Sequence, residues 1–402
     1  MKPSPLVVCR LANLCPSLSL SLRKHSPEIY MRHCLPLVAG AGGLTIAVTL
    51  ACSSAVGPSG TPADGQRGVS TTTPEKVAGA PTLTPQTSGT TNRLQAVSPV
   101  NQNVVWASGV GGTFVLTTDG GETWRAGQVP GAETLEFRDV EGVSAKEAYL
   151  LSSGTGADSR IYKTTDGGQT WTLQFQNTKP DAFYDCFDFW TPNRGLTFSD
   201  PVSGRFPVIR TTDGETWEDI GDQLRAALNG EFAFAASGTC VATQGGNRAW
   251  IATGGATTAR ILATTDGGNS WQAYATPLVS NSSAGAFTVA FRDPFNGIVA
   301  GGDLDPNNPS PENRVAISGD GGQTWQLVEE PPFDGAVFGL SYVTGIRQTV
   351  VATGPAGSAW SSDEGRSWNL LNGVTGYWAV AFASHKAGWL VGTGGRILKV
   401  SF

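Results

Sequence analysis

Hydrophobic residues beyond the N-terminal region of this chain come in short runs, separated by clusters of Gly, Asp, Asn and Ser. The runs are grouped into repeating units of four. One such unit has its runs at 135–140, 148–152, 160–163 and 171–174. Short runs between turn residues indicate β-strands rather than helices. The pattern predicts a single helix, a short one at 222–228. We therefore expect an all-β protein.

A turn motif recurs in each unit, between the third and fourth runs. Its six copies read TTDGGETW, TTDGGQTW, TTDGETW, TTDGGNSW, SGDGGQTW and SSDEGRSW, and successive aspartates are 47, 47, 53, 54 and 43 residues apart. Recurrence with this period indicates a series of similar supersecondary units. The motif resembles the Asp-box, or BNR repeat, of the form S/T-x-D-x-G-x-x-W. Its aspartates and tryptophans are Asp119 and Trp124, Asp166 and Trp171, Asp213 and Trp217, Asp266 and Trp271, Asp320 and Trp325, and Asp363 and Trp368.

These Asp-box residues are predicted to be structural. Glycine tolerates positive φ, and an aspartate side chain accepts hydrogen bonds from the amides of its own turn. An aspartate held in this way cannot also serve as a ligand or a base. The tryptophan starts the next strand, and its ring is expected to fold beneath the turn and seal the end of the unit.

Repetition of the four-stranded unit predicts a single seven-bladed β-propeller over residues 92–402. The second strand of the other complete units is expected at 105–108, 195–199, 249–253, 297–300 and 350–353. A seventh unit has three runs, at 377–383, 388–392 and 396–402, and lacks a fourth. We expect residues 82–89 to supply that strand and to close the ring.

The region before the repeats divides into three segments. Residues 1–30 do not resemble an export signal and are interpreted as a mis-assigned extension, because a signal sequence begins cleanly at Met31. Residues 31–52 resemble a bacterial lipoprotein signal in which Cys52 is lipidated, with plain secretory cleavage and an uncleaved membrane anchor as alternatives. Residues 53–91, of which 29 of 39 are Ser, Thr, Pro, Gly or Ala, predict a flexible tether. The expected location is exported and lipid-anchored, in the periplasm or on the outer cell surface.

The charge and the histidine content of the chain limit the classes of function that it can have. Beyond residue 52 the chain has 22 Lys and Arg against 32 Asp and Glu, which argues against a nucleic-acid partner. The only histidine there is His385, so a Ser-His-Asp triad or a histidine metal site has little material. Cys186 and Cys240 are the only cysteines of the repeat region, and they can either form a disulfide or remain as two buried thiols.

Function is expected on the face opposite the Asp-boxes, where irregular, charged loops connect the second and third strands and join successive units. The candidate binding residues are Asp158, Arg160, Tyr184, Asp185, Asp200, Arg205, Arg210, Glu231, Arg260 and Asp303. They can equally be solvated loop charges and ion pairs between blades. Residues 303–307 have calcium-loop spacing but lack its glycine and closing glutamate, so neither a metal nor a cofactor is predicted.

The repeats from 93 to 402, with GWLVGTGGRI at 388–397 and TTDGGxTW-like turns throughout, resemble the photosystem II stability/assembly factor family. The resemblance implies a seven-bladed BNR propeller of the lumen or periplasm. It also implies a non-enzymatic assembly or scaffold role in photosynthesis and a membrane or envelope protein as partner. We expect a monomer.

An enzyme is the alternative, a sialidase-like glycoside hydrolase that uses carboxylates on the face opposite the Asp-boxes. Such an enzyme needs three arginines that converge beside a Tyr–Glu pair. Residues available for these roles are Arg160, Arg210, Arg260, Tyr184 and Glu231. Their geometry decides between the two hypotheses.

Overall fold

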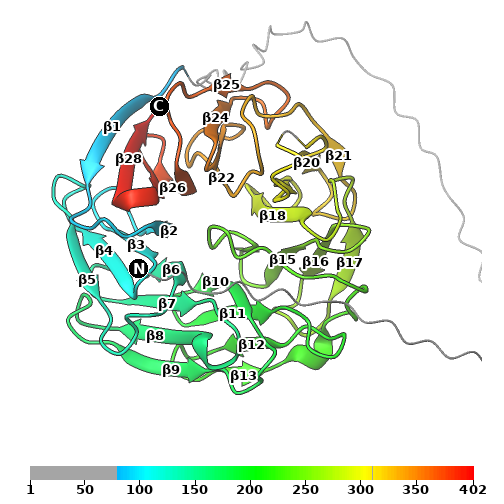
Figure 1. Cartoon of the computed structure of the whole chain (residues 1–402), viewed down its shortest axis with the longest axis horizontal. Coiled ribbons are helices and arrows are strands. Elements are labelled where there is room, and N and C mark those ends of the chain that lie inside the picture. The colour runs from blue at the N-terminus through cyan, green and yellow to red at the C-terminus, as the bar shows by residue number, and fades with distance from the viewer. Residues whose placement is uncertain (1–78, 310) are drawn as a thin grey trace, which may run out of the picture. The chain divides into compact units, whose positions relative to one another are not determined.

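Seven antiparallel four-stranded sheets stand around a central axis in the computed structural model, which describes residues 79–309 and 311–402. The first strand of each sheet lies nearest the axis and the last lies outside (Figure 1). This arrangement confirms the predicted seven-bladed propeller. The segments predicted as a mis-assigned extension and as a signal sequence, with Cys52, and most of the predicted tether lie outside the described residues.

The strands follow the chain in order. The first sheet contains β2 (Leu94–Pro99), β3 (Val105–Gly109), β4 (Thr113–Thr117) and β5 (Arg125–Gln128), and the second contains β6 (Phe137–Gly142), β7 (Ala148–Ser152), β8 (Arg160–Thr164) and β9 (Thr172–Gln176). The third contains β10 (Tyr184–Thr191), β11 (Arg194–Ser199), β12 (Val208–Thr211) and β13 (Glu218–Asp219), and the fourth contains β14 (Val241–Gln244), β15 (Arg248–Thr253), β16 (Arg260–Thr264) and β17 (Gln272–Ala275). The fifth contains β18 (Ala284–Phe291), β19 (Gly297–Asp303), β20 (Val315–Ser318) and β21 (Gln326–Leu327), and the sixth contains β22 (Gly339–Tyr342), β23 (Val350–Gly354), β24 (Gly357–Ser361) and β25 (Asn369–Leu370). The seventh contains β26 (Tyr377–Ser384), β27 (Ala387–Gly392), β28 (Arg396–Ser401) and β1 (Thr82–Thr87).

The ring closes as predicted, through β1. This strand pairs antiparallel with β28, from Thr82 opposite Ser401 to Thr87 opposite Arg396. The Gln86 side chain then accepts hydrogen bonds from the indoles of Trp124 and Trp389, each at 3.1 Å. The expected tether boundary at residue 91 is therefore wrong, because residues 82–87 belong to the propeller.

The predicted helix at 222–228 is wrong. Only one 3-10 turn, η2 (Gly221–Gln223), forms there, and Leu224 is already extended at φ −77° and ψ 153°. Leu224 is buried between the third and fourth sheets, while the Ala227 amide donates to the Gly204 carbonyl at 3.0 Å. These tertiary contacts outweigh the helix propensity of the segment. Two further 3-10 turns are described, η1 (Gly156–Asp158) and η3 (Thr393–Gly395).

Each recurrent aspartate is held inside its own turn. Asp166 Oδ1 accepts the amides of Gln169 and Thr170, both at 2.9 Å, and Oδ2 accepts the Thr170 hydroxyl at 2.6 Å. These bonds, led by the Thr170 hydroxyl, lower the pKa of Asp166 to about 2. The Gly167 amide, at φ +77°, donates to the Lys146 carbonyl in the neighbouring turn at 2.8 Å. The turns between third and fourth strands therefore share a face with those between first and second strands, and we call it the Asp-turn face.

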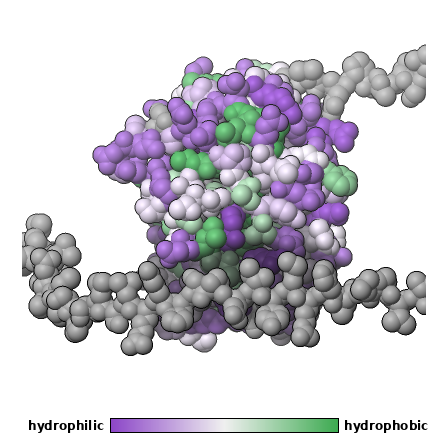
Figure 2. Space-filling model, turned by 90° about the vertical axis from the view of Figure 1, so that its right-hand side faces the viewer, coloured by the Kyte–Doolittle hydropathy of each residue, from purple (hydrophilic) through white to green (hydrophobic). Residues whose placement is uncertain are grey.

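The tryptophans that follow these turns fill the seams between blades. Trp171 packs edge-on against Trp106 and Phe114 of the first sheet, with ring centroids 6.2 and 5.1 Å away. Trp271 and Trp325 do lie beneath their own turns, as predicted. Their indoles donate to the carbonyls of Gly268 and Gly322. The hydrophobic core thus lies between adjacent sheets. Figure 2 shows the outer side of the ring, where polar residues predominate and apolar residues form small separate spots.

Candidate functional site

Several predicted site residues are engaged in the structure of the loops. Glu231, whose side chain is fully buried, pairs with Arg260 and accepts the Thr253 hydroxyl at 2.6 Å. Tyr184 is buried with its ring edge-on to Phe175. These contacts bind neighbouring segments together and offer no group to a ligand.

Two predicted residues lie on one loop of the second sheet. Asp158 is exposed at the end of η1, and Arg160 Nε donates to the Ala157 carbonyl at 2.7 Å. Arg160 also donates to the Tyr162 hydroxyl at 3.2 Å.

Arg205 is exposed in the loop between β11 and β12, where it lines an outer cavity of about 500 Å³.

Arg210 lies on the other face from the one predicted. Its guanidinium bonds Glu218 at 2.7 Å and the Gly267 carbonyl at 3.1 Å, and it reaches Asn269 at 3.0 Å. Gly267 and Asn269 belong to the Asp turn of the fourth sheet. The Arg210 side chain, on the third strand β12, points sideways to the next blade, and the prediction from loop positions did not allow for this.

The arginines nominated for a sialidase do not converge. Arg160 bonds within its own sheet, Arg210 bonds the turn of the fourth sheet, and Arg260 bonds Glu231. The structure therefore does not supply the triad beside a Tyr–Glu pair that this alternative requires.

The calcium-like spacing at 303–307 is used for loop structure. Burial opposes ionisation of Asp303, but hydrogen bonds from the Ser283 hydroxyl, the Asp305 amide and the Asn308 and Asn281 side chains outweigh it and lower its pKa to about 2. Within residues 79–309 and 311–402, no group of three or more His, Cys, Asp or Glu side chains is arranged to hold a metal ion.

A cavity of about 460 Å³ lies at the centre of the ring, on the face opposite the Asp turns. We call it the central cavity. Its lining comes from the inner strands and from the segments that lead into them. The lining residues are Arg93, Gln95, Arg138, Phe183, Asp185, Asp200, Phe232, Ala233, Phe234, Ala235, Ala236, Phe287, Leu304, Phe338 and Trp378.

Register shifts place the lining side chains. The pairing of first and second strands slips by one residue at the same point of five sheets. A bulge of this kind re-aims a side chain and is frequent beside functional sites. The bulged residues are Gln95, Arg138, Asp185, Phe287 and Trp378, and all five line the central cavity.

Aromatic rings form a continuous arc along one wall. Ring centroids are 4.8 Å apart between Phe232 and Phe234, 3.9 Å between Phe234 and Phe287, 5.8 Å between Phe287 and Phe338, and 5.0 Å between Phe338 and Trp378. Offset-stacked and edge-on pairs of this kind stabilise each other, so the arc is a rigid surface.

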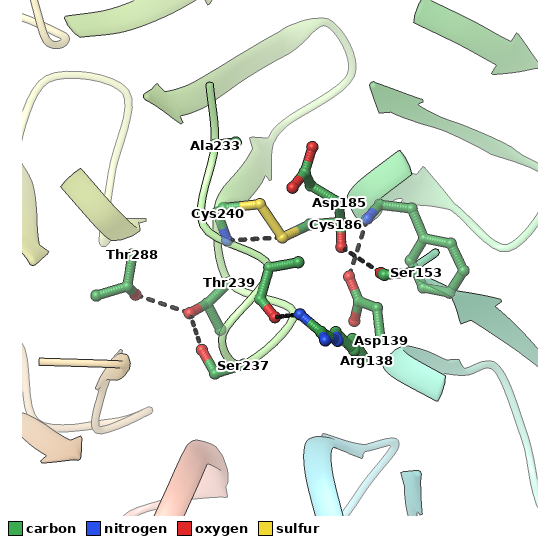
Figure 3. Close-up of a disulfide and its surroundings, with 12 residues drawn as sticks. Arg138, Asp139, Ser153, Asp185, Cys186, Ala233, Ser237, Thr239, Cys240 and Thr288 are labelled. Carbon is green, nitrogen blue, oxygen red and sulfur yellow. Dashed lines mark hydrogen bonds between the residues drawn. A yellow bond between two sulfur atoms is a disulfide. The ribbon is translucent and has the colours of Figure 1, made fainter. Parts of the chain in front are cut away.

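Two carboxyl groups lie beside the Phe232 end of this arc, where Asp200 accepts the Ala233 amide at 2.8 Å. Asp185 is fully buried, and Figure 3 shows it beside the Cys186–Cys240 disulfide. Burial, reinforced by the charge of Asp200, raises the pKa of Asp185 well above its ordinary value, although Arg138 and the Asp200 amide oppose the shift. Burial also raises the pKa of Asp200 to about 7. The disulfide decides between the two states left open for these cysteines.

Only Asp185 and Asp200 of the ten predicted binding residues line the central cavity. Sequence reasoning missed Arg93, Gln95, Arg138, Phe287, Phe338 and Trp378. The available signal was positional, since most of them stand at or just before the start of a first strand, near the axis.

The fold and this cavity define a seven-bladed propeller with a lined central site. The propeller is similar to two solved structures of YCF48. One, described as YCF48 bound to D1 peptide, has a TM-score of 0.55 and 17% identity, over 81% of this chain and 98% of that chain. The other, YCF48 from Cyanidioschyzon merolae, has a TM-score of 0.54 and 18% identity, over 79% and 98%.

A GH74 enzyme from Niastella koreensis is more distant, with a TM-score of 0.39 and 16% identity over 77% of this chain and 56% of that chain. No protein-family model and no curated protein matches the sequence. The expected resemblance to the photosystem II assembly factors is thus confirmed by YCF48, and at these identities it shows the shared fold.

Proposed function

We propose that this protein is a non-enzymatic binding or assembly scaffold, and that its central cavity receives a segment of a partner protein. One observation carries the proposal: five first strands slip by one residue at the same point, and each slip turns a side chain toward the same cavity. A ring built for stability alone has no need of five such departures. A YCF48 structure described as bound to D1 peptide supports a peptide ligand.

The shape of the site suits an extended polypeptide. Its volume of about 460 Å³ lies within the range of ligand pockets, ~300–1,000 Å³. A second cavity of about 270 Å³ shares Leu304 and Phe338 with it and continues under the loop at 303–309. Leu304, at the junction of the two cavities, is 50% exposed and therefore accessible to a ligand.

We further propose that the protein is exported and lipid-anchored at Cys52, which lies outside the described residues. A membrane or envelope protein would then be its partner, and the protein itself a monomer. The six Asp turns are assigned to the Asp-box (BNR) class on their shared hydrogen bonding. No helix in the described part of the chain is long and apolar enough to cross a membrane.

Affinity capture from the organism's own membranes tests the scaffold proposal. Leu304→Glu and Trp378→Ala alter the central cavity, and the control Glu122→Lys reverses a charge at an exposed position on the Asp-turn face. The cavity variants should lose a partner that the wild type and Glu122→Lys retain. Capture that survives both cavity variants, or fails with Glu122→Lys, would overturn the proposal.

The glycosidase hypothesis retains one observation in its favour, the two carboxyls Asp185 and Asp200 in one cavity. It predicts that the purified protein hydrolyses an aryl glycoside and releases the phenol, and that Asp185→Asn loses this activity.

A further inference from the structure

A carboxyl group without a partner stands in the wall of the central cavity. Asp185 is fully buried, and neither of its carboxylate oxygens has a hydrogen-bond partner among the described residues. Nearby amides are already engaged: the Asp200 amide donates to the Phe183 carbonyl at 2.9 Å, and the Ala233 amide donates to Asp200 Oδ1 at 2.8 Å. Most buried polar groups are paired, so the unpaired side chains of Asp185 and Gln95 in this cavity point to a missing ligand.

We propose that Asp185, together with Asp200, receives a positively charged nitrogen group from the polypeptide segment that the cavity binds. This inference rests on the proposed function and names the chemistry of the inserted residue. Two carboxyls beside an arc of aromatic faces are the surroundings that an ammonium or guanidinium prefers.

The aromatic faces of this cavity already accept cations. The Arg93 guanidinium lies 4.4 Å from the Trp378 ring, and Arg138 lies 5.7 Å from the Phe183 ring. Both arginines face a single carboxylate at the rim, that of Glu136, which lies 2.8 Å from Arg138 and 3.7 Å from Arg93. Glu136 compensates one of these two positive charges at the rim. Asp185 and Asp200 lie deeper and form an ion pair with neither arginine.

Chain geometry holds the acceptor in place. Asp185 is the bulged residue of β10, and the disulfide that follows it ties Cys186 to Cys240. The segment from Phe232 to Cys240 forms the adjoining wall, so the carboxyl cannot retreat without breaking these restraints. A fixed, desolvated acceptor loses little entropy when the ligand arrives.

Binding of a cation should release a proton. The charged groups that face Asp185 are Asp200 and Arg138, with Arg93 and Glu136 at the rim and Asp139 on the adjacent strand. The pKa values of Asp185 and Asp200 are both raised, that of Asp200 to about 7, so the empty cavity favours a proton on this pair. Because the cation replaces this proton, affinity should increase as the pH rises.

The test uses the purified protein and capped single residues as probes. Nα-acetyl-lysine methylamide and Nα-acetyl-arginine methylamide present basic side chains, and glycine methylamide presents a free N-terminal ammonium. Nα-acetyl-norleucine methylamide is the neutral control. Binding is followed through the NMR signal of the Trp378 indole, assigned with Trp378→Phe. At least one cationic probe should bind about tenfold more tightly than norleucine and gain about tenfold between about pH 6 and about pH 7, as one released proton requires. Which probe binds identifies the source of the charge.

Asp185→Asn should remove both the preference and the pH dependence while leaving the circular dichroism spectrum unchanged, and Asp200→Asn should weaken both. Equal binding of norleucine, pH-independent binding, or wild-type behaviour of Asp185→Asn would overturn the inference. Tighter binding of acetyl-glutamate methylamide would do the same and place the ligand's charge opposite the two arginines. If Leu304→Glu abolishes partner capture but Asp185→Asn does not, the cavity binds the partner and the charge assignment alone fails. If neither affects capture, the proposed function fails.

Discussion

Arg292 donates its Nε hydrogen to Oε1 of Glu364, 2.5 Å away, and so ties the fifth blade to the Asp turn of the sixth. The Tyr342 hydroxyl donates to the same oxygen at 3.0 Å. Glu364 follows the aspartate of the sixth turn, where the other five copies have glycine, and it adopts φ +59°. The departure from the repeat therefore has a structural cause, since a contact between blades offsets a strained backbone.

Two substitutions at Glu364 separate these effects. Glu364→Ala and Glu364→Gly both remove the ion pair, but only glycine relieves the positive φ. We expect both variants to unfold more easily than the wild type, with Glu364→Gly more stable than Glu364→Ala by about 1 kcal/mol. Urea unfolding measures the difference. Equal stabilities would show that the backbone at residue 364 is not strained.

The Cys186–Cys240 disulfide joins positions 54 residues apart and links the third blade to the start of the fourth. A closed loop of this length stabilises a fold by about 4 kcal/mol through the entropy of the unfolded chain. Reduction, or the Cys186→Ala/Cys240→Ala double variant, should lower the free energy of unfolding by about that amount, as measured by denaturant titration with and without reductant. An unchanged midpoint after reduction would contradict a stabilising role.

The strands could be predicted from the sequence because each one depends on a local pattern of residues. The predicted run at 148–152 coincides with β7, and residues 82–89 were expected to complete the seventh sheet, where β1 lies. The central cavity depends instead on one-residue slips in pairing. A slip is a relation between two strands, and it reverses which face a side chain occupies. Nothing local to Arg138 or Trp378 reveals that it is bulged. Arg210 was misjudged for a different reason, because its side chain reaches sideways to the turn of the next blade.

Two carboxyls near the axis make stability depend on pH at the alkaline end. Burial, with the charge of Asp188 as second cause, raises the pKa of Glu141 to about 8, and burial raises that of Asp188 to about 6. An acid whose folded pKa is raised stabilises the fold below its unfolded pKa, ~4, and this contribution is lost as the pH rises through the folded value. The free energy of unfolding should therefore fall between about pH 5 and about pH 8.

Glutamine at position 141 keeps the shape and removes the titration, so Glu141→Gln should flatten this decline, whereas Glu122→Gln at an exposed turn position should not. The turn and loop carboxyls act in the opposite sense. The pKa of Asp303 is lowered to about 2 because hydrogen bonds outweigh its burial, so its contribution is present above ~4 and lost as the pH falls toward 2. Thermal melts across the range should show a maximum between these limits, and a steady rise toward pH 8 would contradict the assignment.

Two phenylalanines of one strand distinguish a binding role from a structural one. Phe287 is the bulged residue of β18 and stacks on Phe234 in the arc that lines the central cavity. Phe291, at the other end of the same strand, stacks on Trp250 with centroids 3.6 Å apart, and it lies toward the Asp-turn face. Truncation of either ring removes packed aromatic surface, so both Phe287→Ala and Phe291→Ala should lower the free energy of unfolding, by about 3 kcal/mol for a fully buried ring.

Binding should separate them. At a temperature where both variants are folded, Phe287→Ala should lose capture of the partner because it opens the arc that the ligand contacts, while Phe291→Ala should capture it as the wild type does. Circular dichroism melts and affinity capture on the same preparations give the comparison. If capture declines in proportion to stability in both variants, the arc contributes packing alone and the cavity has no claim to be the binding site.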